Sequence, residues 1–206
     1  MAEYERQVFL NVPFDKRYAK LLDALVFGVR ACGLHPRCAL ETDDGGQVRL
    51  TKLLDIISAC RFGVHDLSRT TLDSAQRLPR FNMPLELGLF LGATTFGPSK
   101  QRRKRCLILE RDPYRYQAFC SDIAGQDIRA HGNDTSRALT AVRNWLQTHL
   151  PPSHHLPGPA TLSAWYVDFR RQLPFMCREL QLRPRELTFL DYRSLVEAWL
   201  AINDHG

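Results

Sequence analysis

The chain has no apolar run that approaches the roughly 20 residues needed to cross a bilayer. The first residues, Met1 to Arg6, are charged, and no apolar stretch of the secretory-signal kind follows them. These two absences argue against membrane and secreted classes. They predict a soluble, cytoplasmic protein without a membrane partner.

The spacings that mark metal and phosphate sites are also missing. The 6 cysteines are scattered, with no C-x-x-C pair and no histidines at zinc-finger spacing. That distribution favours reduced, mostly buried thiols and no metal site. Neither G-x-G-x-x-G nor G-x-x-x-x-G-K-S/T occurs, so the phosphate-binding loops of standard dinucleotide folds and P-loop enzymes are lacking. We therefore expect no metal ion and no organic cofactor.

What the chain does contain is enough apolar material for a real core. Its 206 residues are 44% hydrophobic, which suits one well-filled domain and a small appendage. The net charge of +6 permits an anionic partner but does not require one.

Short apolar strands alternate with amphipathic helices through residues 1–150. The predicted strands cover residues 7–12, 35–40, 61–66 and 106–109, with a short element near 127–129, and the predicted helices cover 14–29, 48–57, 84–93 and 134–149. This alternation predicts parallel pairing through right-handed crossovers. We therefore predict an α/β fold: a flavodoxin-like parallel sheet of about five strands flanked by helices.

Prolines between residues 151 and 159 mark the end of that domain, because they cannot extend a helix. Residues 151–206 are predicted to form a helical extension, with helices near 162–173 and 192–202. Its large apolar side chains are too many for a freely exposed appendage; they are Trp165, Phe169, Phe175, Phe189, Tyr192, Leu195 and Trp199. They must pack on the core, on each other or on a second subunit, and we predict a homodimer.

Two carboxylates follow the third predicted strand. Asp66 ends the strand, and Glu86 lies just inside the next helix if Asn82 caps that helix. Ligands of open α/β sheets bind beside the carboxyl ends of the strands, so the two acids are expected to share one small substrate. Helix-terminal amides favour an ionised Glu86, and such a carboxylate can attack an anomeric carbon or stabilise its transition state. The alternative is that both acids have only the ordinary roles of acids at helix starts and loops.

The exit of the first strand is predicted to face the same crevice. It reads Asn11-Val12-Pro13-Phe14-Asp15, and its strand should lie beside the third one in a flavodoxin-like order. Asn11, Pro13, Phe14 and Asp15 are therefore candidate substrate-binding residues.

Three motifs in this order carry a resemblance. They are Asn11-Val12-Pro13-Phe14, then Asp66-Leu67-Ser68, then Asn82 followed by Glu86-Leu87-Gly88. Over roughly residues 7–100 the chain resembles the nucleoside 2-deoxyribosyltransferase superfamily, whose flavodoxin-like layout is similar to that of TIR-type NAD-cleaving domains.

The resemblance implies cleavage or transfer at the N-glycosidic bond of a nucleoside or nucleotide, NAD included. It makes Glu86 the nucleophile, Asp66 the ribose-binding or proton-handling group and Asn82 a positioning residue. It also implies a bacterial nucleotide-processing or phage-defence setting. The rival function is a non-catalytic nucleotide-binding sensor that signals through its helical tail.

Other polar residues complete the predicted site. Ser68 lies in the loop after Asp66, and Arg69 and Arg80 in the same loop region are placed to bind a substrate phosphate. Glu41, after the second strand, is predicted either to bind ribose hydroxyls or to belong to a solvated turn.

Two further features have a structural alternative. The cationic run Lys100 to Arg105 either contacts nucleic-acid phosphates, the less favoured reading, or forms a solvated loop. His65 should point away from Asp66 by strand alternation and pack in the core.

Overall fold

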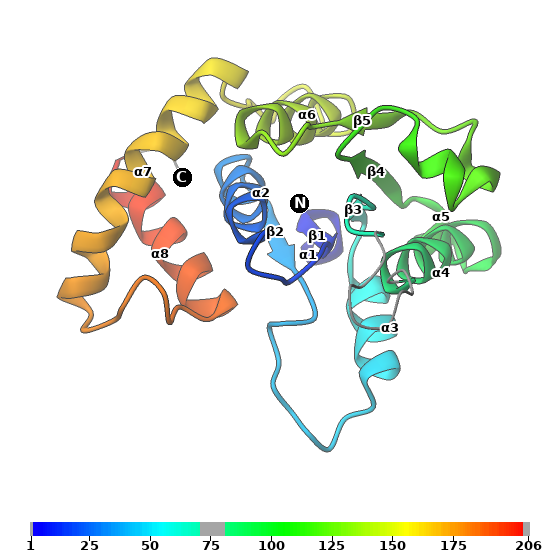
Figure 1. Ribbon diagram of the computed structural model, residues 1–206, viewed down its shortest axis with the longest axis horizontal. Helices are drawn as coiled ribbons and strands as arrows, with labels where there is room; N and C mark the ends of the chain where they lie inside the picture. Colours follow the sequence, from blue (N-terminus) through cyan, green and yellow to red (C-terminus); the bar gives the residue numbers. More distant parts are fainter. Residues whose placement is uncertain (1, 71–80, 204–206) are drawn as a thin grey trace.

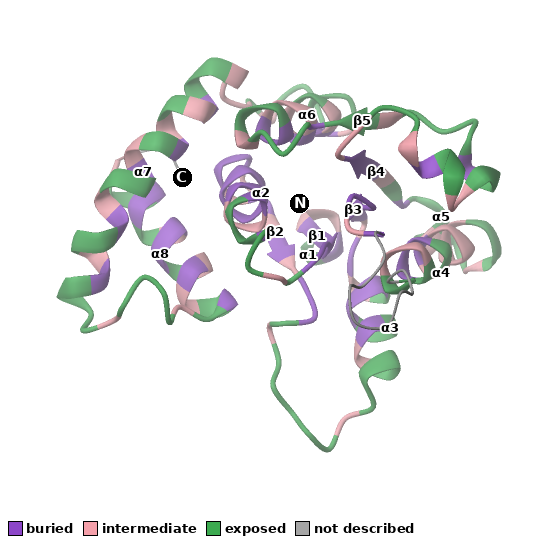
Figure 2. Ribbon diagram, viewed as in Figure 1, coloured by how far each residue is buried: buried purple, intermediate pink, exposed green. Residues whose placement is uncertain are grey.

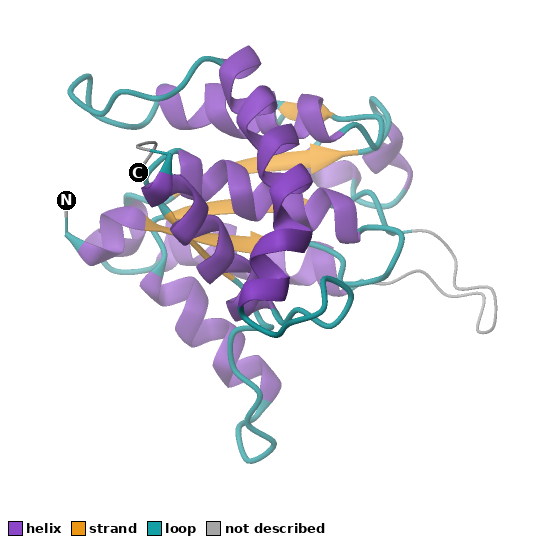
Figure 3. Ribbon diagram, turned by 90° about the vertical axis from the view of Figure 1, so that its left-hand side faces the viewer, coloured by secondary structure: helices purple, strands orange, loops and turns teal. Residues whose placement is uncertain are grey.

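The computed structural model describes residues 2–70 and 81–203. Five parallel strands form one sheet in the order β2-β1-β3-β4-β5, with helices on both sides (Figures 1 and 3). The strands are β1 (Gln7–Asn11), β2 (His35–Arg37), β3 (Phe62–Asp66), β4 (Arg105–Glu110) and β5 (Ile128–Ala130). The predicted flavodoxin-like sheet is confirmed.

Helices connect the strands and extend beyond the last one. They are α1 (Glu3–Arg6), α2 (Ala19–Ala31), α3 (Arg49–Ala59), α4 (Asn82–Phe96), α5 (Ser99–Arg102), α6 (Thr135–Gln147), α7 (Pro159–Glu179) and α8 (Phe189–Ile202), with 3-10 turns η1 (Arg115–Ala118) and η2 (Ser121–Ile123). Within the described residues, none of the helices combines the length and apolar character that a bilayer crossing requires.

Successive side chains of a strand point to opposite faces of the sheet, so the core forms one layer on each face. Val8 and Leu10 of β1 pack in the cluster that α2 and α6 cover, whereas Phe9 packs with residues of α3 and α4. On β3, Phe62 and Val64 belong to the α2 side in the same way. Every residue of β1 and β3 is buried, as expected for central strands covered on both faces.

Close approach of α4 to the sheet depends on a glycine in β3. A Cβ at Gly63 would lie 2.6 Å from Nε2 of His65 and 2.8 Å from the ring of Phe90. Both rings are fully or almost fully buried, so neither has room to move. We infer that any side chain at this position would push α4 away from the sheet.

The C-terminal helices complete the core on the α2 side. Phe27 of α2 lies 5.3 Å from Phe169 and 5.8 Å from Trp199 between ring centroids. Most large apolar side chains of the tail are thus buried against this chain's own core, and the buried inner faces of α7 and α8 are visible in Figure 2. Phe175, at 62% exposed, is among the exceptions.

The prediction that the cationic run forms a solvated loop is wrong in part: Lys100, Arg102, Arg103 and Arg105 are exposed, but the run begins as a helix and Lys104 is buried. Residues Ser99–Arg102 form the short helix α5, and Lys104 is 1% exposed. Its ammonium group donates to the carbonyl oxygens of Ile57 and Cys60 and lies over the ring of Phe90. Burial lowers the pKa of Lys104 to about 8. One of the five cations is therefore inaccessible to a phosphate.

Candidate functional site

A cavity of about 310 Å³ opens where the exits of β1 and β3 meet the starts of α3 and α4. The chain runs from β1 to β2 in one direction and from β3 to β4 in the other, so this is the crevice where the strand order reverses. The cavity is lined by Val12, Pro13, Phe14, Asp15, Arg49, Arg69, Asn82 and Met83. Four of the predicted substrate-binding residues, Pro13, Phe14, Asp15 and Asn82, are therefore brought together.

Two arginines supply positive charge to this cavity. The guanidinium of Arg69 lies 3.0 Å from Asp15, and this ion pair ties the exit of β3 to the exit of β1. Arg49, the first residue of α3, makes no ion pair with any described residue. Among the described lining residues, Arg49 is therefore the cation that is available to an anionic ligand.

Glu86 lies one turn further along α4 than the lining residues Asn82 and Met83. It is 5% exposed, and burial raises its pKa to about 7, although the charge of Arg49 acts in the opposite direction. Glu86 does not itself line the cavity, but it follows the lining residues Asn82 and Met83 on the same helix. A carboxyl group with this pKa exists in both protonation states near neutral pH.

The predicted cap of α4 is wrong by one residue. The helix starts at Asn82 and its preceding residue is Phe81, with no side-chain capping bond. Glu86 is then the fifth helical residue, and the first turn contains no acid. The helix terminus therefore does not favour ionisation of Glu86, and burial determines its pKa.

Asn11, at the end of β1, joins the sheet to α4 and does not itself line the cavity. Its side-chain amide donates to the carbonyl oxygen of Met83 at 2.9 Å and lies 3.0 Å from Nδ1 of His65. Burial, with the charge of Lys104, lowers the pKa of His65 to about 3, so its ring is neutral. His65 packs edge-on against Phe9 and Phe90, as predicted for a core histidine.

Asp66 is the centre of a second, fully buried polar cluster. Its Oδ1 accepts the backbone amide of Ser68 at 2.8 Å. Its Oδ2 accepts the hydroxyl of Tyr18 and lies 3.0 Å from Nε2 of His131. Burial alone would raise the pKa of Asp66, but the contact with His131 and the hydrogen bonds from Ser68 and Tyr18 outweigh it and lower the pKa below its ordinary value.

The structure does not bring Asp66 and Glu86 together over one substrate. Side chains two residues apart on a strand lie on the same face of the sheet, so Asp66 shares the face of Phe62 and Val64, which α2 covers. Glu86 belongs to α4, which covers the opposite face of the sheet. Asp66 is also 0% exposed and does not line the cavity. The expectation of a carboxylate pair is therefore wrong for this conformation, and Glu86 is the acid associated with the cavity.

The remaining predicted residues lie elsewhere. Ser68 is 2% exposed and belongs to the Asp66 cluster. Glu41 accepts hydrogen bonds from Arg37, at 2.7 Å to Oε2, beside a different pocket at the β2 edge of the sheet. Arg80 lies outside the described residues.

Sequence reasoning missed Tyr18, His131 and Arg49. Nδ1 of His131 accepts the amide of Asn133 at 3.0 Å, so its Nε2 carries the hydrogen that faces Asp66. His131 directly follows β5, and a strand exit is a signal that could have found it. Tyr18 and Arg49 fall at helix starts where no local pattern distinguishes them.

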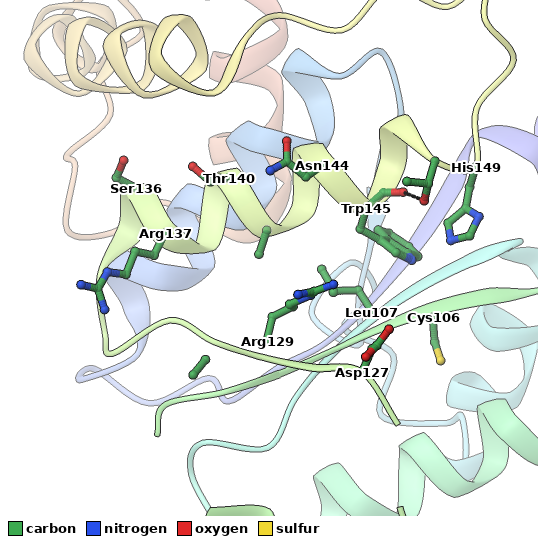
Figure 4. A pocket seen from close by; sticks show the side chains of 13 residues that line it. Cys106, Leu107, Asp127, Arg129, Ser136, Arg137, Thr140, Asn144, Trp145 and His149 are labelled. Carbon is green, nitrogen blue, oxygen red and sulfur yellow. Dashed lines mark hydrogen bonds between the residues drawn. The ribbon is translucent and has the colours of Figure 1, made fainter. Parts of the chain in front are cut away.

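A larger cavity, of about 830 Å³, lies away from these residues, between α6 and the strands β4 and β5 (Figure 4). In Figure 4 the side chains of Arg129 and Arg137 point to different parts of the groove, so they do not converge on one anion. Among the described residues, no group of three or more histidine, cysteine, aspartate or glutamate side chains is arranged to hold a metal ion.

Comparisons with protein-family models, with curated proteins and with solved structures found no match. Function is therefore inferred from the residues of this chain.

Proposed function

We propose that this protein cleaves or transfers at the N-glycosidic bond of a nucleoside or nucleotide, with Glu86 as the group that attacks or stabilises the anomeric carbon. The single observation that supports this most is a buried glutamate with a pKa of about 7 beside a cavity at the strand-order reversal. The volume of about 310 Å³ lies at the lower end of the range for small-molecule sites. A nucleoside is a ligand of suitable size.

The lining residues suit the parts of such a substrate. The apolar ring of Phe14 and the proline before it offer a surface for the base, and Asn82 offers hydrogen bonds to the sugar. The guanidinium of Arg49 suits a phosphate. When Glu86 is ionised it attacks the anomeric carbon, and the bond to the base breaks with its electron pair leaving on the base, which takes a proton from water. Water or a second base then attacks the same carbon and loses a proton to solvent, while the bond to Glu86 breaks and restores the carboxylate.

Asp66 has an indirect role in this proposal. It holds Tyr18 at the start of α2 and the amide of Ser68, and these contacts fix the two loops beside the cavity. It is a positioning residue here, without direct contact with the substrate.

Base release tests the proposal. The protein is incubated with nucleosides, nucleoside monophosphates and NAD, and the released base is measured by chromatography. We expect release from at least one substrate, falling by about a hundredfold or more in Glu86→Gln, because an amide cannot act as nucleophile or base. Glu41→Gln is the matched control, and it should keep full activity because Glu41 lies beside a different pocket. Release that survives in Glu86→Gln would contradict the proposal.

Arg49→Ala separates phosphate recognition from catalysis. We expect it to weaken binding of a nucleoside monophosphate by about tenfold and to change nucleoside binding little, because a charge-assisted hydrogen bond is lost only with the phosphate. The pH midpoint of activity should also move upward, since Arg49 lowers the pKa of Glu86. Binding is measured by calorimetry, with Arg171→Ala on α7 as the control. Equal weakening for nucleoside and monophosphate would exclude the phosphate role.

A nucleotide sensor without turnover is the second candidate. The observation that favours it is the saturated state of Asp66, which leaves no second acid to assist the leaving base. A sensor predicts that nucleotides raise the melting temperature while no base is released. The same incubation therefore distinguishes the two functions.

We also infer a cytoplasmic homodimer in a bacterial nucleotide-processing or defence setting, following the resemblance. The homodimer was predicted from the apolar side chains of residues 151–206. These side chains are mostly buried within this chain, so they do not support dimerisation. Exposed apolar side chains near the cavity support it instead: Val48 at 68%, Phe81 at 59% and Leu85 at 59% exposed.

A further inference from the structure

A further cavity, of about 730 Å³, lies between the start of α2 and the C-terminal helices. Its lining comes from the first half of α2 and the segment before it, from Leu40 after β2, from α7, from the 184–188 segment and from the start of α8. None of its residues lines the cavity beside Glu86. It is therefore a separate site within this chain.

The floor of this cavity is apolar. Val26 of α2 and Leu173 of α7 are 1% and 3% exposed, and Phe189 at the start of α8 is 7% exposed. Partly exposed Leu22 and Leu187 continue this surface toward the opening. Such a floor favours hydrocarbon over polar groups, at about 25 cal/mol for each Å² of apolar surface removed from water.

The rim has the opposite character, because it is cationic. Lys16, Lys20 and Arg185 are exposed at the opening, and none of them forms an ion pair with any described residue. A fourth cation, Arg170, is already neutralised by Asp23 at 2.6 Å. Three positive charges therefore remain available over an apolar floor.

We propose that this cavity binds an amphipathic anion, a hydrocarbon chain with a terminal carboxylate or phosphate. The hydrocarbon tail of the ligand lies against Leu22, Val26 and Leu173. Its anionic head lies between Lys16, Lys20 and Arg185. The pairing of apolar floor and unpaired cationic rim selects this class. A small inorganic anion would not use the floor, and a neutral hydrocarbon would not use the rim.

Three probes test each half of the proposal by calorimetry at low ionic strength, below micelle-forming concentrations. Decanoate has both tail and charge, decanol has the tail alone, and acetate has the charge alone. We expect decanoate to bind about tenfold or more tightly than either of the others. Equal binding of decanol, or no binding of decanoate, would overturn the proposal. Vesicles of anionic phospholipid test whether the protein binds a bilayer surface instead of a free amphiphile. A protein that binds the vesicles but not decanoate would also overturn the proposal.

Variants locate the site. Lys16→Glu combined with Lys20→Glu reverses two exposed charges and should weaken decanoate binding by about tenfold, an effect that salt reduces. Arg171→Glu makes the same kind of change on α7 outside the cavity and should have no effect. Ala19→Trp fills the opening without removing a buried contact and should abolish binding. Decanoate affinity that is unchanged in both cavity variants would refute the assignment. These measurements need no base release, so they succeed or fail independently of the function proposed for Glu86.

Discussion

Glu86→Gln is expected to stabilise the protein by roughly 3 kcal/mol at pH 8, because it removes a buried negative charge. Burial raises the pKa of Glu86 from the ordinary 4.5 to about 7. That difference corresponds to about 3 kcal/mol of unfavourable free energy when the carboxylate is ionised in the folded state. Urea denaturation monitored by circular dichroism measures the effect.

The sign follows from proton binding. Between pH 4.5 and about 7 the folded state binds more protons at Glu86 than the unfolded state, so the free energy of unfolding falls as pH rises through this window. Glutamine does not titrate, and the advantage of the variant should therefore vanish near pH 4 and be complete near pH 8. Asp43→Asn, at an exposed turn, is the control and should change stability little at either pH. A wild-type protein as stable as Glu86→Gln at pH 8 would show that Glu86 is not held in a desolvated site.

A stability gain at this position would itself bear on function. Most substitutions of buried residues destabilise a protein, and positions where the native residue is costly are typical of functional sites. Loss of base release together with a gain in stability would therefore separate a catalytic role of Glu86 from a structural one.

The sheet could be predicted from the sequence because its signal is local and repeated. Each apolar strand is followed by a helix with one apolar face, and this alternation permits few topologies. The end of α2 was also predictable, because a glycine directly after a helix favours the left-handed backbone conformation. Gly33, which follows the helix and its C-cap, has this conformation, with φ of 73°. Because the loops at the strand exits converge in this topology, Pro13, Phe14 and Asp15 could be placed at the crevice, whereas Asn82 was assigned to it from the resemblance.

The face on which each acid lies could not be predicted. β1 and β3 are buried on both sides, so their polar residues, such as Asn11 and His65, do not alternate with apolar ones in a pattern that would tell which face of the sheet each side chain lies on. Two acids can then share an edge of the sheet and still face different helices, as Asp66 and Glu86 do.

Contacts between residues far apart in the chain could not be predicted from the sequence either. Lys104 is separated by 47 residues from Ile57, whose carbonyl oxygen it meets, so a charge run at the surface and a buried lysine look identical in sequence. Tyr18 is 48 residues from Asp66, and nothing near Tyr18 marks it as a hydrogen-bond donor to a buried acid.

Asp66→Asn is expected to destabilise the protein by about 3 kcal/mol at pH 7. Both carboxylate oxygens face donors: the amide of Ser68 on one side, and Tyr18 with His131 on the other. An asparagine must turn its NH₂ group toward one of these sides, which places donor against donor and leaves buried groups unsatisfied. Urea denaturation with a comparison of m-values measures the loss and shows whether the unfolded state has changed.

The pH dependence should be opposite to that of Glu86→Gln. Because the folded-state pKa of Asp66 is below the ordinary 3.8, its stabilisation is fully present above pH 3.8 and is lost as pH falls through the folded-state pKa. The difference in free energy of unfolding between the wild type and Asp66→Asn should therefore become smaller only in strong acid. Tyr18→Phe removes one donor and leaves the carboxylate, so it should cost less, about 1 to 2 kcal/mol. If Asp66→Asn were no less stable than Tyr18→Phe, the cluster would not depend on a charged carboxylate at its centre, and Asp66 could not hold the loops beside the cavity in the way proposed.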